Sequence, residues 1–568
     1  MKPHISLVVL MISTLILVSA DLDGHGGQFK LPVTAGAQGE QGESGSAAGA
    51  VQKGYSFPGG GPQIAFSESR WEFWWDFHHE PFLNLRGVLY SRTPAAGVID
   101  FPFEQITSDE KRIKLVRQLS NYLQRAREQS VRSAAVLALA RTKDPNVVPY
   151  IEIAYRKDSV LEVRTDAVLA LGVTENPRAI GILRSILDDD KVSMEIRFFA
   201  AISLGLIGGE KAAMVLKDYL KPDQFRRLKR EIQYGVSFAA GLTNEPTLAP
   251  MVRDLLVNNV ADGDVNRSFL VTSLGRLADR TANPLLVTIL EKDHAKVKRS
   301  AAVALGVSAT SSDKDVIQAL TRAAGSDGDS MVRNFACIAL GRIGGPEAEK
   351  ALLKLFKTVT SSSKNAFVAI SLGLTGNSDN GAIVLQRFKA LRDTSTRSAV
   401  AIALGLLKYT PALGELRRTF DKNSDPIFRS YCAQALGLME DADSIERLRK
   451  TMTESNDVEL IRSCAIALGL IGDHRAVELL QEMCGRKRSD VVRQAASYCI
   501  GLIGDRNSID LLTEIAGNDA NNSQIKSYAI IALGLLGRDN KIPVVSRVTR
   551  NMNYTILETS LYEIYNVN

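Results

Sequence analysis

The stretch Arg462-Ser-Cys-Ala-Ile-Ala-Leu-Gly469-Leu-Ile-Gly472-Asp473 recurs, with small changes, along most of the chain. Aligning the copies on their first glycine gives thirteen of them, spaced 31 to 36 residues apart. The marker residues are Ala140, Gly172, Gly205, Gly241, Gly275, Gly306, Gly341, Gly373, Gly405, Gly437, Gly469, Gly501 and Gly534. A fixed period in this range is typical of a solenoid, in which each unit buries its apolar face only by stacking on the next.

Each copy contains two predicted helices, and the quoted phrase forms the second. The residues two and five positions before the marker are small in most copies, as Ala135 and Ala167 are, so neighbouring helices can approach closely there. Helix C-caps are expected three residues after the marker, at Gly208, Gly344, Gly376, Gly472, Gly504 and Gly537. The pattern predicts an all-α, right-handed α-α superhelix over residues 110–545. With helix rows about 8–10 Å apart, we expect an arc roughly 100–130 Å long.

An arginine stands eight residues before the marker in most copies, on a helix face that points partly inward. An aspartate precedes it in many of the loops, as Asp329 and Asp425 do. Because a buried cation is stable only when paired, we interpret these residues as a structural ladder in which aspartates cap the helices and pair with arginines. Its members are Arg132, Arg164, Arg197, Arg267, Arg333, Arg397, Arg429, Arg462 and Arg493. Alternatively, these fixed guanidinium groups could receive an anionic ligand.

All three tryptophans lie in the stretch Trp71-Glu-Phe-Trp74-Trp75-Asp-Phe-His78-His79-Glu80-Pro81. Trp71, Trp74, Trp75 and His78 follow helical spacing and so share one face of a short helix. We interpret this helix, within residues 63–109, as an N-terminal cap over the open apolar end of the first repeat. The alternatives are an aromatic ligand pocket and a foot at a membrane interface. Neighbouring histidines on a regular helix diverge by about 100°, so we predict no metal site here.

Two copies break the arginine pattern, with Gln233 and Asn365 in its place. The insertion before the first break carries a basic cluster, Arg226, Arg227, Lys229 and Arg230. Departures from a repeat are places where function can be added. We therefore predict a partner contact at this cluster and near Lys364, although a solvated helix face is the plain alternative, and an electrostatic platform for anionic glycans or membranes is another.

The two ends of the chain differ from the repeats. A basic start at Lys2, an apolar run over residues 5–18 and the small residues before Asp21 form the pattern of a secretory signal peptide, residues 1–20, cleaved near Ala20. We expect an exported mature protein, periplasmic or extracellular, without a transmembrane segment. Residues 21–62 are predicted to be a Gly/Ser/Gln-rich flexible linker, and residues 546–568 a C-terminal cap.

Composition limits the function further. The net charge of +6 is small beside 69 basic and 63 acidic residues, so we expect no binding of nucleic acid. The five cysteines form no disulfide framework. Four of them fall on the small-residue face of a helix, and we predict buried free thiols at Cys337, Cys432, Cys464 and Cys499.

The phrase Val-Arg-x-x-Ala-x-x-Ala-Leu-Gly-x-Ile-Gly-Asp resembles the HEAT-like repeats of the phycobilisome-lyase type, over residues 110 to about 540. The tryptophan stretch is similar to a segment that precedes such repeats in exported bacterial HEAT-repeat proteins. The resemblance implies an armadillo-type solenoid. Two kinds of enzyme have repeats of this class and must therefore be considered. Phycobilin lyases act inside the cell, which the signal peptide argues against. Deoxyhypusine hydroxylase binds two irons through repeated His-Glu pairs, whereas the one His-Glu pair here, His79-Glu80, lies outside the repeats.

These observations predict no catalytic residues, no cofactor and no metal. We expect a non-catalytic, exported scaffold that binds a protein or peptide partner on its concave face. The alternative is a small-molecule-binding or enzymatic protein of the same repeat class that uses the helix of Trp71–Trp75 as a pocket.

Overall fold

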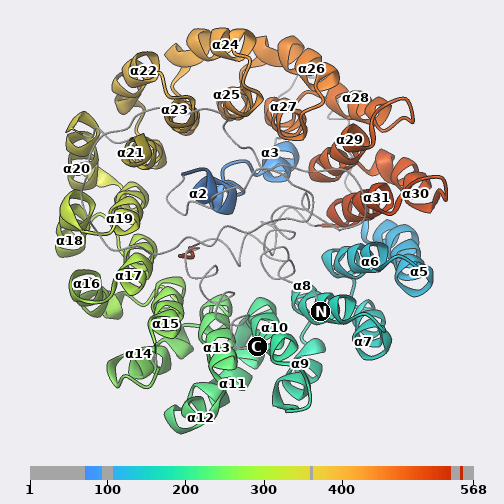
Figure 1. The fold of residues 1–568 in the computed structure, drawn as a ribbon, viewed down its shortest axis with the longest axis horizontal. Helices are drawn as coiled ribbons and strands as arrows, with labels where there is room; N and C mark the ends of the chain where they lie inside the picture. Colours follow the sequence, from blue (N-terminus) through green and yellow to red (C-terminus); the bar gives the residue numbers. More distant parts are fainter. Residues whose placement is uncertain (1–70, 92–105, 262, 359–361, 539–550, 554–568) are drawn as a thin grey trace, which may run out of the picture.

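The computed structural model describes residues 71–91, 106–261, 263–358, 362–538 and 551–553. All regular structure in these residues is helical, which confirms the predicted all-α solenoid. Each repeat is a pair of helices, one on the inside and one on the outside of the curve (Figure 1). The inner helices carry the repeated phrase and are α6 (Gln129–Arg141), α8 (Leu161–Val173), α10 (Met194–Ile207), α13 (Arg230–Leu242), α15 (Asp264–Arg276), α17 (Ala295–Ser308), α19 (Ser330–Ile343), α21 (Ser362–Leu374), α23 (Thr394–Leu406), α25 (Pro426–Leu438), α27 (Val458–Ile471), α29 (Asp490–Ile503) and α31 (Ser523–Leu536).

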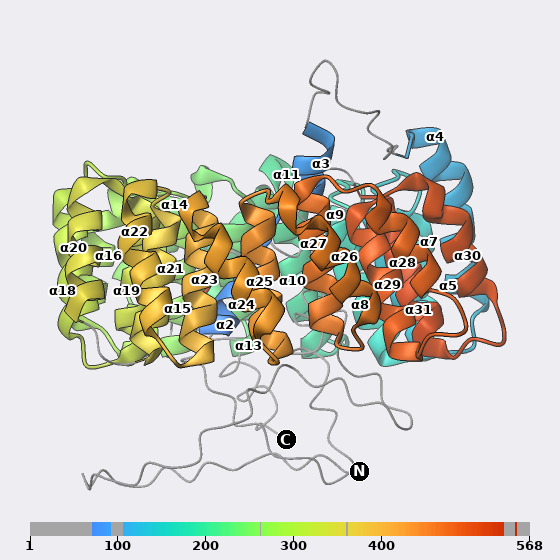
Figure 2. The same cartoon turned by 90° about the horizontal axis from the view of Figure 1, so that it is seen from above.

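The outer helices are shorter on average and amphipathic. They are α5 (Arg117–Arg125), α7 (Val148–Lys157), α9 (Ala179–Asp188), α11 (Gly209–Leu220), α14 (Ala249–Val257), α16 (Asn283–Lys292), α18 (Lys314–Ser326), α20 (Gly345–Thr358), α22 (Gly381–Ala390), α24 (Leu413–Lys422), α26 (Ile445–Glu454), α28 (Arg475–Met483) and α30 (Ile509–Gly517). A further short helix, α12 (Pro222–Arg227), follows α11 and contains the predicted basic insertion. Figure 2 shows the helices standing side by side, roughly along the axis of the molecule.

The small residues predicted to allow close packing lie where neighbouring inner helices touch. A Cβ atom added at Gly437 would lie 2.6 Å from the Cα of Ala467, and one at Gly501 would lie 2.7 Å from the Cα of Ala532. A real Cβ cannot approach backbone so closely, so the marker glycine is required at these positions. The cost of a glycine within a helix, about 1 kcal/mol relative to alanine, is offset by this packing.

The solenoid closes on itself. Inner helix α31 packs against α6 in the same way as each inner helix packs against the next. A Cβ added at Gly534 would lie 2.6 Å from the Cα of Ala138, which repeats the contact seen at the other joints. The molecule is therefore a ring, as Figures 1 and 2 show. The expected open arc is wrong, because the curvature accumulated over thirteen repeats brings the last repeat onto the first.

Ion pairs and a hydrogen bond also join the outer layers across this closing joint. Lys114 lies in η1 (Lys111–Val116), a π-helical turn before α5, and its Nζ lies 3.8 Å from a carboxylate oxygen of Asp510 in α30. An Arg506 nitrogen lies 3.7 Å from a carboxylate oxygen of Glu110, and the Tyr122 hydroxyl donates to the Thr513 carbonyl oxygen at 3.2 Å. These contacts join residues almost 400 positions apart in sequence.

The position three residues after the marker has left-handed backbone in most repeats. Five of the six predicted glycine caps are confirmed by a positive φ, at Gly208, Gly344, Gly376, Gly472 and Gly504. Gly537 is also the C-cap of α31, as predicted, but with a φ of −68° it ends the helix without a left-handed turn. Other repeats keep the left-handed turn with a residue that has a side chain, at Lys143, Glu175, Asn244, Ala278, Lys408 and Glu440.

The predicted signal peptide and linker, residues 1–20 and 21–62, lie outside the described residues. Of the predicted C-terminal cap, the structure describes only residues 551–553. The Asn553 side chain donates to the Lys296 carbonyl oxygen at 3.1 Å and to Ser300 Oγ at 3.2 Å, both on α17. Asn553 therefore contacts the inner helix of a middle repeat. None of the described helices combines the length and the apolar character needed to cross a membrane.

Candidate functional site

Residues 71–91 lie inside the ring, against the inner helices from α21 to α31 (Figure 1). We call them the inner segment; it consists of α2 (Trp71–His78), a turn, and α3 (Leu85–Ser91). Trp71, Trp74, Trp75 and Leu89 are buried in it. The predicted cap over the first repeat is not what the structure shows. The first repeat is covered by the last one, and the tryptophan helix instead fills part of the concave face.

Trp71 attaches α2 to the inner helices α23 and α25. Its indole Nε1 donates to Ser395 Oγ at 3.1 Å, and that hydroxyl donates to Glu72 Oε1 at 2.6 Å. The indole ring packs on Tyr431, with ring centroids 4.8 Å apart. A buried indole N–H without an acceptor would destabilise the fold. The hydrogen bond to Ser395 therefore fixes where α2 lies on the inner face and how deeply its indole is buried.

Trp75 makes the equivalent contact one turn further on. Its Nε1 donates to Gln434 Oε1 at 2.9 Å, and Gln434 Nε2 donates to Ser463 Oγ at 3.0 Å. The indole also stacks on Phe82 with centroids 5.9 Å apart. The inner face thus presents polar side chains, from α25 and α27, at the places where the segment needs acceptors.

Trp74 and the two histidines complete the helix. The rings of Trp74 and His78 stack with centroids 4.7 Å apart, and His78 Nδ1 lies 2.7 Å from the Trp74 carbonyl oxygen. His79 Nδ1 lies 3.1 Å from the Trp75 carbonyl oxygen. Burial lowers the pKa of His79, and the cation Arg462 lowers it further, while the carboxylates of Glu80 and Glu459 act in the opposite direction. Within the described residues, no three His, Cys, Asp or Glu side chains are grouped to hold a metal ion.

The second half of the inner segment enters a joint between repeats. The Cβ position of Gly469 faces a methyl carbon of Leu85 at 2.3 Å, whereas other marker glycines face the next inner helix. Arg86 follows and is buried. Its guanidinium donates to the carbonyl oxygens of Gly501 at 3.1 Å, Leu502 at 3.4 Å, Leu536 at 3.5 Å and Arg538 at 2.7 Å. A cation at the C-terminal ends of α29 and α31 is favoured by both helix dipoles.

The arginine ladder lies between the layers. Its arginines donate to carbonyl oxygens at the end of the preceding outer helix: Arg164 to Tyr155, Arg197 to Leu187, Arg429 to Phe420 and Arg493 to Cys484. Others pair with an aspartate of the next repeat, as Arg132 does with Asp158 and Arg267 with Asp293.

The remaining ladder arginines have contacts of other kinds. Arg333 donates to the carbonyl oxygens of Asp327 and Gly328. Arg462 pairs with Glu459, and Arg397 packs between Phe388 and Phe428. Gln233 replaces an arginine and still donates to the Phe225 carbonyl oxygen, at 2.9 Å.

A second row of ion pairs was not predicted. Arginines on outer helices pair with an aspartate four residues after the next marker, as Arg449 does with Asp473 and Arg253 with Asp279. Arg417 pairs with Asp441 in the same way. The signal was present in the sequence, because Asp279, Asp441, Asp473 and Asp505 recur at one position of the repeat.

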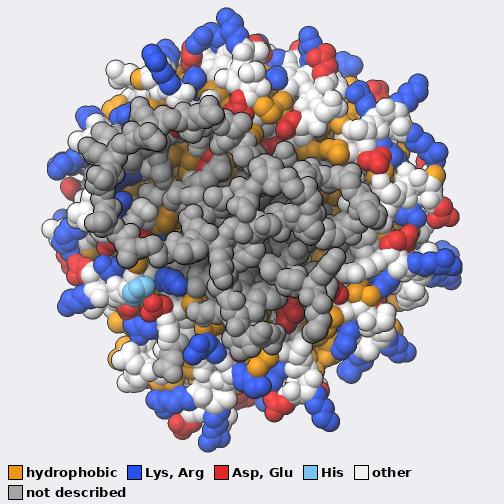
Figure 3. All heavy atoms as spheres, viewed as in Figure 1, with side chains coloured by type: hydrophobic (Ala, Val, Ile, Leu, Met, Phe, Trp, Pro, Cys, Tyr) orange, Lys and Arg blue, Asp and Glu red, His pale blue; other side chains and the backbone are white. Residues whose placement is uncertain are grey.

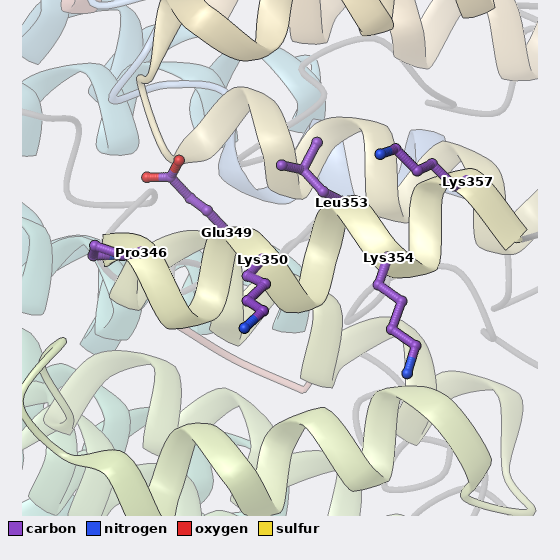
Figure 4. A pocket seen from close by; sticks show the side chains of 6 residues that line it. All are labelled: Pro346, Glu349, Lys350, Leu353, Lys354 and Lys357. Atoms are coloured by element: carbon purple, nitrogen blue, oxygen red, sulfur yellow. The ribbon is translucent and has the colours of Figure 1, made fainter.

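The predicted basic cluster and Lys364 lie in different repeats. Arg226, Arg227, Lys229 and Arg230 are exposed around the end of α12 and the start of α13, while Lys364 is half-buried in α21. Figure 3 shows lysines and arginines spread around the whole edge of the ring, mixed with acidic residues. An open pocket of about 570 Å³ also lies at the outer helix α20, where Lys350, Leu353 and Lys354 are among the lining residues (Figure 4). The structure does not join these features into one patch.

All five cysteines are buried and free. Burial raises the pKa of Cys337, Cys432 and Cys499 to about 12 and that of Cys484 to about 11. The pKa of Cys464 is raised for the same reason. A thiol that stays protonated is a poor nucleophile, so these residues are core side chains rather than reactive ones.

Comparison with known proteins agrees with the repeat assignment. HEAT repeats are matched at residues 116–195, 250–334, 284–366 and 416–500. The chain carries HEAT repeats. No curated protein matches the sequence.

Solved structures share the helical-repeat fold at low identity. Human deoxyhypusine hydroxylase is 18% identical, covering 52% of this chain and 96% of its own, with a TM-score of 0.22. The complex of CpcE and CpcF of phycocyanin lyase from a Nostoc species is 20% identical, covering 45% and 93%, with a TM-score of 0.29. A structure of the Kap95:Nup1 complex is 12% identical, covering 75% and 69%, with a TM-score of 0.38. At these scores the likeness carries no argument about function.

Proposed function

We propose that this protein is an exported, non-catalytic HEAT-repeat ring that binds a protein or peptide partner on the inner face of the ring. The observation that carries the proposal is the inner segment, because the chain's own residues 71–91 already lie on this face as a bound peptide would. Two indole N–H groups find acceptors on inner helices, and one guanidinium reaches four backbone carbonyl oxygens. A surface that holds a helix by such contacts is suited to recognise a helical segment of another protein.

The inner face of a closed ring also favours this assignment on physical grounds. A concave surface surrounds a peptide from several directions, so each residue of the partner makes more contacts than it would on a convex surface. The outer face, in contrast, carries charged side chains, some of them paired with one another, such as Arg322 with Glu291 and Arg418 with Glu415. The exposed cluster Arg226, Arg227, Lys229 and Arg230 is our candidate for a second contact with the same partner.

The alternative use of the tryptophan helix as a small-molecule pocket gains no support from its surroundings. Trp71 and Trp75 have 2% and 1% of their surface exposed, and both indole N–H groups are already bonded to the ring. A ligand would have to displace these contacts.

The test is capture of partners from the native cell envelope and culture fluid with the tagged mature chain, residues 21–568, followed by cross-linking mass spectrometry. Our proposal predicts a reproducible partner whose cross-links include Lys296, on inner helix α17. Cross-links confined to lysines of outer helices, such as Lys350 and Lys354 on α20, would contradict it. A capture without any partner, in an experiment whose positive control works, would also contradict it.

Changing Arg226, Arg227, Lys229 and Arg230 to alanine tests the second contact, and we expect weaker capture by this variant with the inner cross-links retained. Export is tested separately, by N-terminal sequencing of the protein purified from its own host. We expect a chain that begins near Asp21; a chain that begins at Met1 would contradict export by cleavage.

A further inference from the structure

Two arginines meet at the closing joint of the ring. Arg141 is the last residue of α6, and Arg538 lies two residues after the end of α31. The packing of α31 on α6 brings these helix ends together, since a Cβ at Gly537 would lie 3.1 Å from Thr142 Cγ2. The two guanidinium groups are close enough that the charge of Arg538 acts on the pKa of Arg141.

Both arginines stand at repeat positions that are occupied differently in most copies. The residue directly after the marker is aliphatic in ten of the thirteen copies and arginine in three, at Arg141, Arg276 and Arg342. The residue four positions after the marker is aspartate in several copies, where it pairs with an arginine of the preceding outer helix. In the last copy this aspartate is replaced by Arg538. The closing joint therefore brings Arg141 next to Arg538, the one cation at a repeat position that is acidic or uncharged in every other copy.

Neither guanidinium is paired within the described chain. Arg141 Nη1 and Arg538 Nε are buried, and no hydrogen-bond acceptor lies within reach of either atom. Three ladder arginines show the contrast, since Arg132, Arg197 and Arg493 donate to carboxylates or carbonyl oxygens, whereas Arg397 has a buried Nε without an acceptor and packs between two aromatic rings. Burial lowers the pKa of Arg141 to about 10, with a smaller effect in the same direction from Arg538. Both side chains are half-buried, and two such cations beside each other are stabilised by an anion that lies with them.

Two neighbouring residues, Tyr498 and Arg86, complete the surroundings of the two arginines. Tyr498 on α29 is near enough to interact electrostatically with Arg141, and burial raises the pKa of its hydroxyl, which therefore stays protonated. The inner segment holds the loop in place, because Arg86 donates to the Arg538 carbonyl oxygen at 2.7 Å. Arg86 cannot itself supply an anion site, since its N–H groups are used by carbonyl oxygens.

We propose that Arg141 and Arg538 together bind an anionic group, a carboxylate or a phosphate, at the inner edge of the closing joint. A guanidinium presents a planar set of donors that matches either anion, and two of them can neutralise one phosphate dianion. An anion there bridges the first repeat and the last, so its binding strengthens ring closure. The site stands independently of the partner proposed for the inner face.

The first experiment titrates inorganic phosphate into the purified full chain at constant ionic strength, with chloride as the balancing anion, by calorimetry and thermal unfolding. We expect saturable binding and a rise in Tm. The double variant Arg141→Gln/Arg538→Gln should lose at least about tenfold in affinity, and each single variant should lose part of it. The matched control Arg226→Gln/Arg227→Gln removes two exposed arginines and should bind phosphate as the parent does. Equal phosphate affinity in the parent and the double variant would overturn the proposal.

A second measurement keeps the test decisive if a variant folds poorly. Without phosphate, Arg141→Gln removes an unpaired, half-buried charge and should raise Tm, whereas Arg132→Gln removes a paired one and should lower it. A fall in Tm for Arg141→Gln in phosphate-free buffer would overturn the proposal, because it would show that the charge is already satisfied. Acetate then distinguishes the sources: competition with phosphate supports a carboxylate ligand, and binding of phosphate alone supports a phosphate group.

Discussion

The closing joint, between α31 and α6, and the joint between α27 and α29 are built from the same repeated phrase but are completed differently. At the closing joint Gly534 faces the backbone of Ala138, as other marker glycines face the next inner helix. At the α27–α29 joint Gly469 faces the side chain of Leu85, and Arg86 bonds to the ends of the helices beyond it. The closing joint consists of one inner helix packed on another, whereas the α27–α29 joint also contains residues of the inner segment, which lies outside the repeats.

This difference shows how a repeat protein can combine a closed architecture with a specialised surface. Uniform joints propagate the curvature that closes the ring. The joint that contains the inner segment gives the inner face one surface whose residues differ from those at the other joints. Function is therefore expected near the exception rather than among the regular repeats.

The largest expected effect comes from Gly534→Leu. Its side chain would collide with the backbone of α6, so the closing contact should be lost at a cost of at least about 3 kcal/mol in the free energy of unfolding. Small-angle scattering should show a larger radius of gyration, and urea unfolding should show the loss of stability. Gly181→Leu is the matched control, because the Cβ position of Gly181 in α9 has nothing within 4 Å. An unchanged radius for Gly534→Leu would contradict the closed ring.

The same substitution at the other joint, Gly469→Leu, should have a different result. The atom in its way is the end of the Leu85 side chain, so α3 should be displaced while the ring stays closed. We expect an unchanged radius of gyration with red-shifted tryptophan emission, since the indoles belong to the displaced segment. An open ring in this variant would show that the inner segment is needed for closure.

Arg86→Met should cost roughly 3 kcal/mol, because carbonyl oxygens of α29 and α31 lose a charged donor while the buried stem is retained. Hydrogen exchange should rise at the ends of these two helices and much less at α13. Arg226→Met, an exposed arginine, is the control and should change stability by less than about 0.5 kcal/mol. Equal effects of the two substitutions would contradict the role assigned to Arg86.

Trp75→Phe should have a smaller effect, a loss of about 1–2 kcal/mol, because the ring is largely kept but Gln434 loses a donor. In the background of this variant, Gln434→Leu should cost less than it does in the parent. A double-mutant cycle on urea midpoints measures this coupling, and strictly additive effects would argue against the hydrogen bond.

The smallest expected effect depends on pH. The pKa of His79 in the folded protein is lowered, mainly by burial, so the neutral ring is favoured when the segment is bound. The corresponding stability is present above the unfolded pKa of about 6.5 and is lost as the pH falls through the folded pKa. Tryptophan emission of the parent should shift to the red on acidification more than that of His79→Gln. Identical pH profiles would exclude His79 as the cause.

Much of the fold could be predicted from local pattern. Small residues around each marker, left-handed turns after it and buried cysteines all follow from the period of the phrase. Ring closure could not be predicted, because it depends on the angle between successive repeats summed over the whole array. The position of the tryptophan helix was also beyond local reasoning, since Trp71 contacts Ser395, 324 residues away.

The site was only partly visible in the sequence. The tryptophans stood out by composition, and their shared helix face is real, but the surface they cover is formed by repeats far along the chain. Arg86 carried no signal, because a single arginine in an irregular stretch has no pattern around it. Arg538 could have been found as the one cation at a repeat position otherwise occupied by aspartate or uncharged residues in most copies.

Zero-length cross-linking across the closing joint tests the ring most directly. A carbodiimide joins lysine to a carboxylate only at contact distance, and Lys114 and Asp510 provide such a pair between the first and last repeats. Lys408 and Glu440, in neighbouring repeats, provide the matched control. The closed ring predicts that both cross-links form within the monomer in comparable yield. Formation of the control cross-link while Lys114 and Asp510 remain unlinked, or become linked only between two chains, would contradict closure.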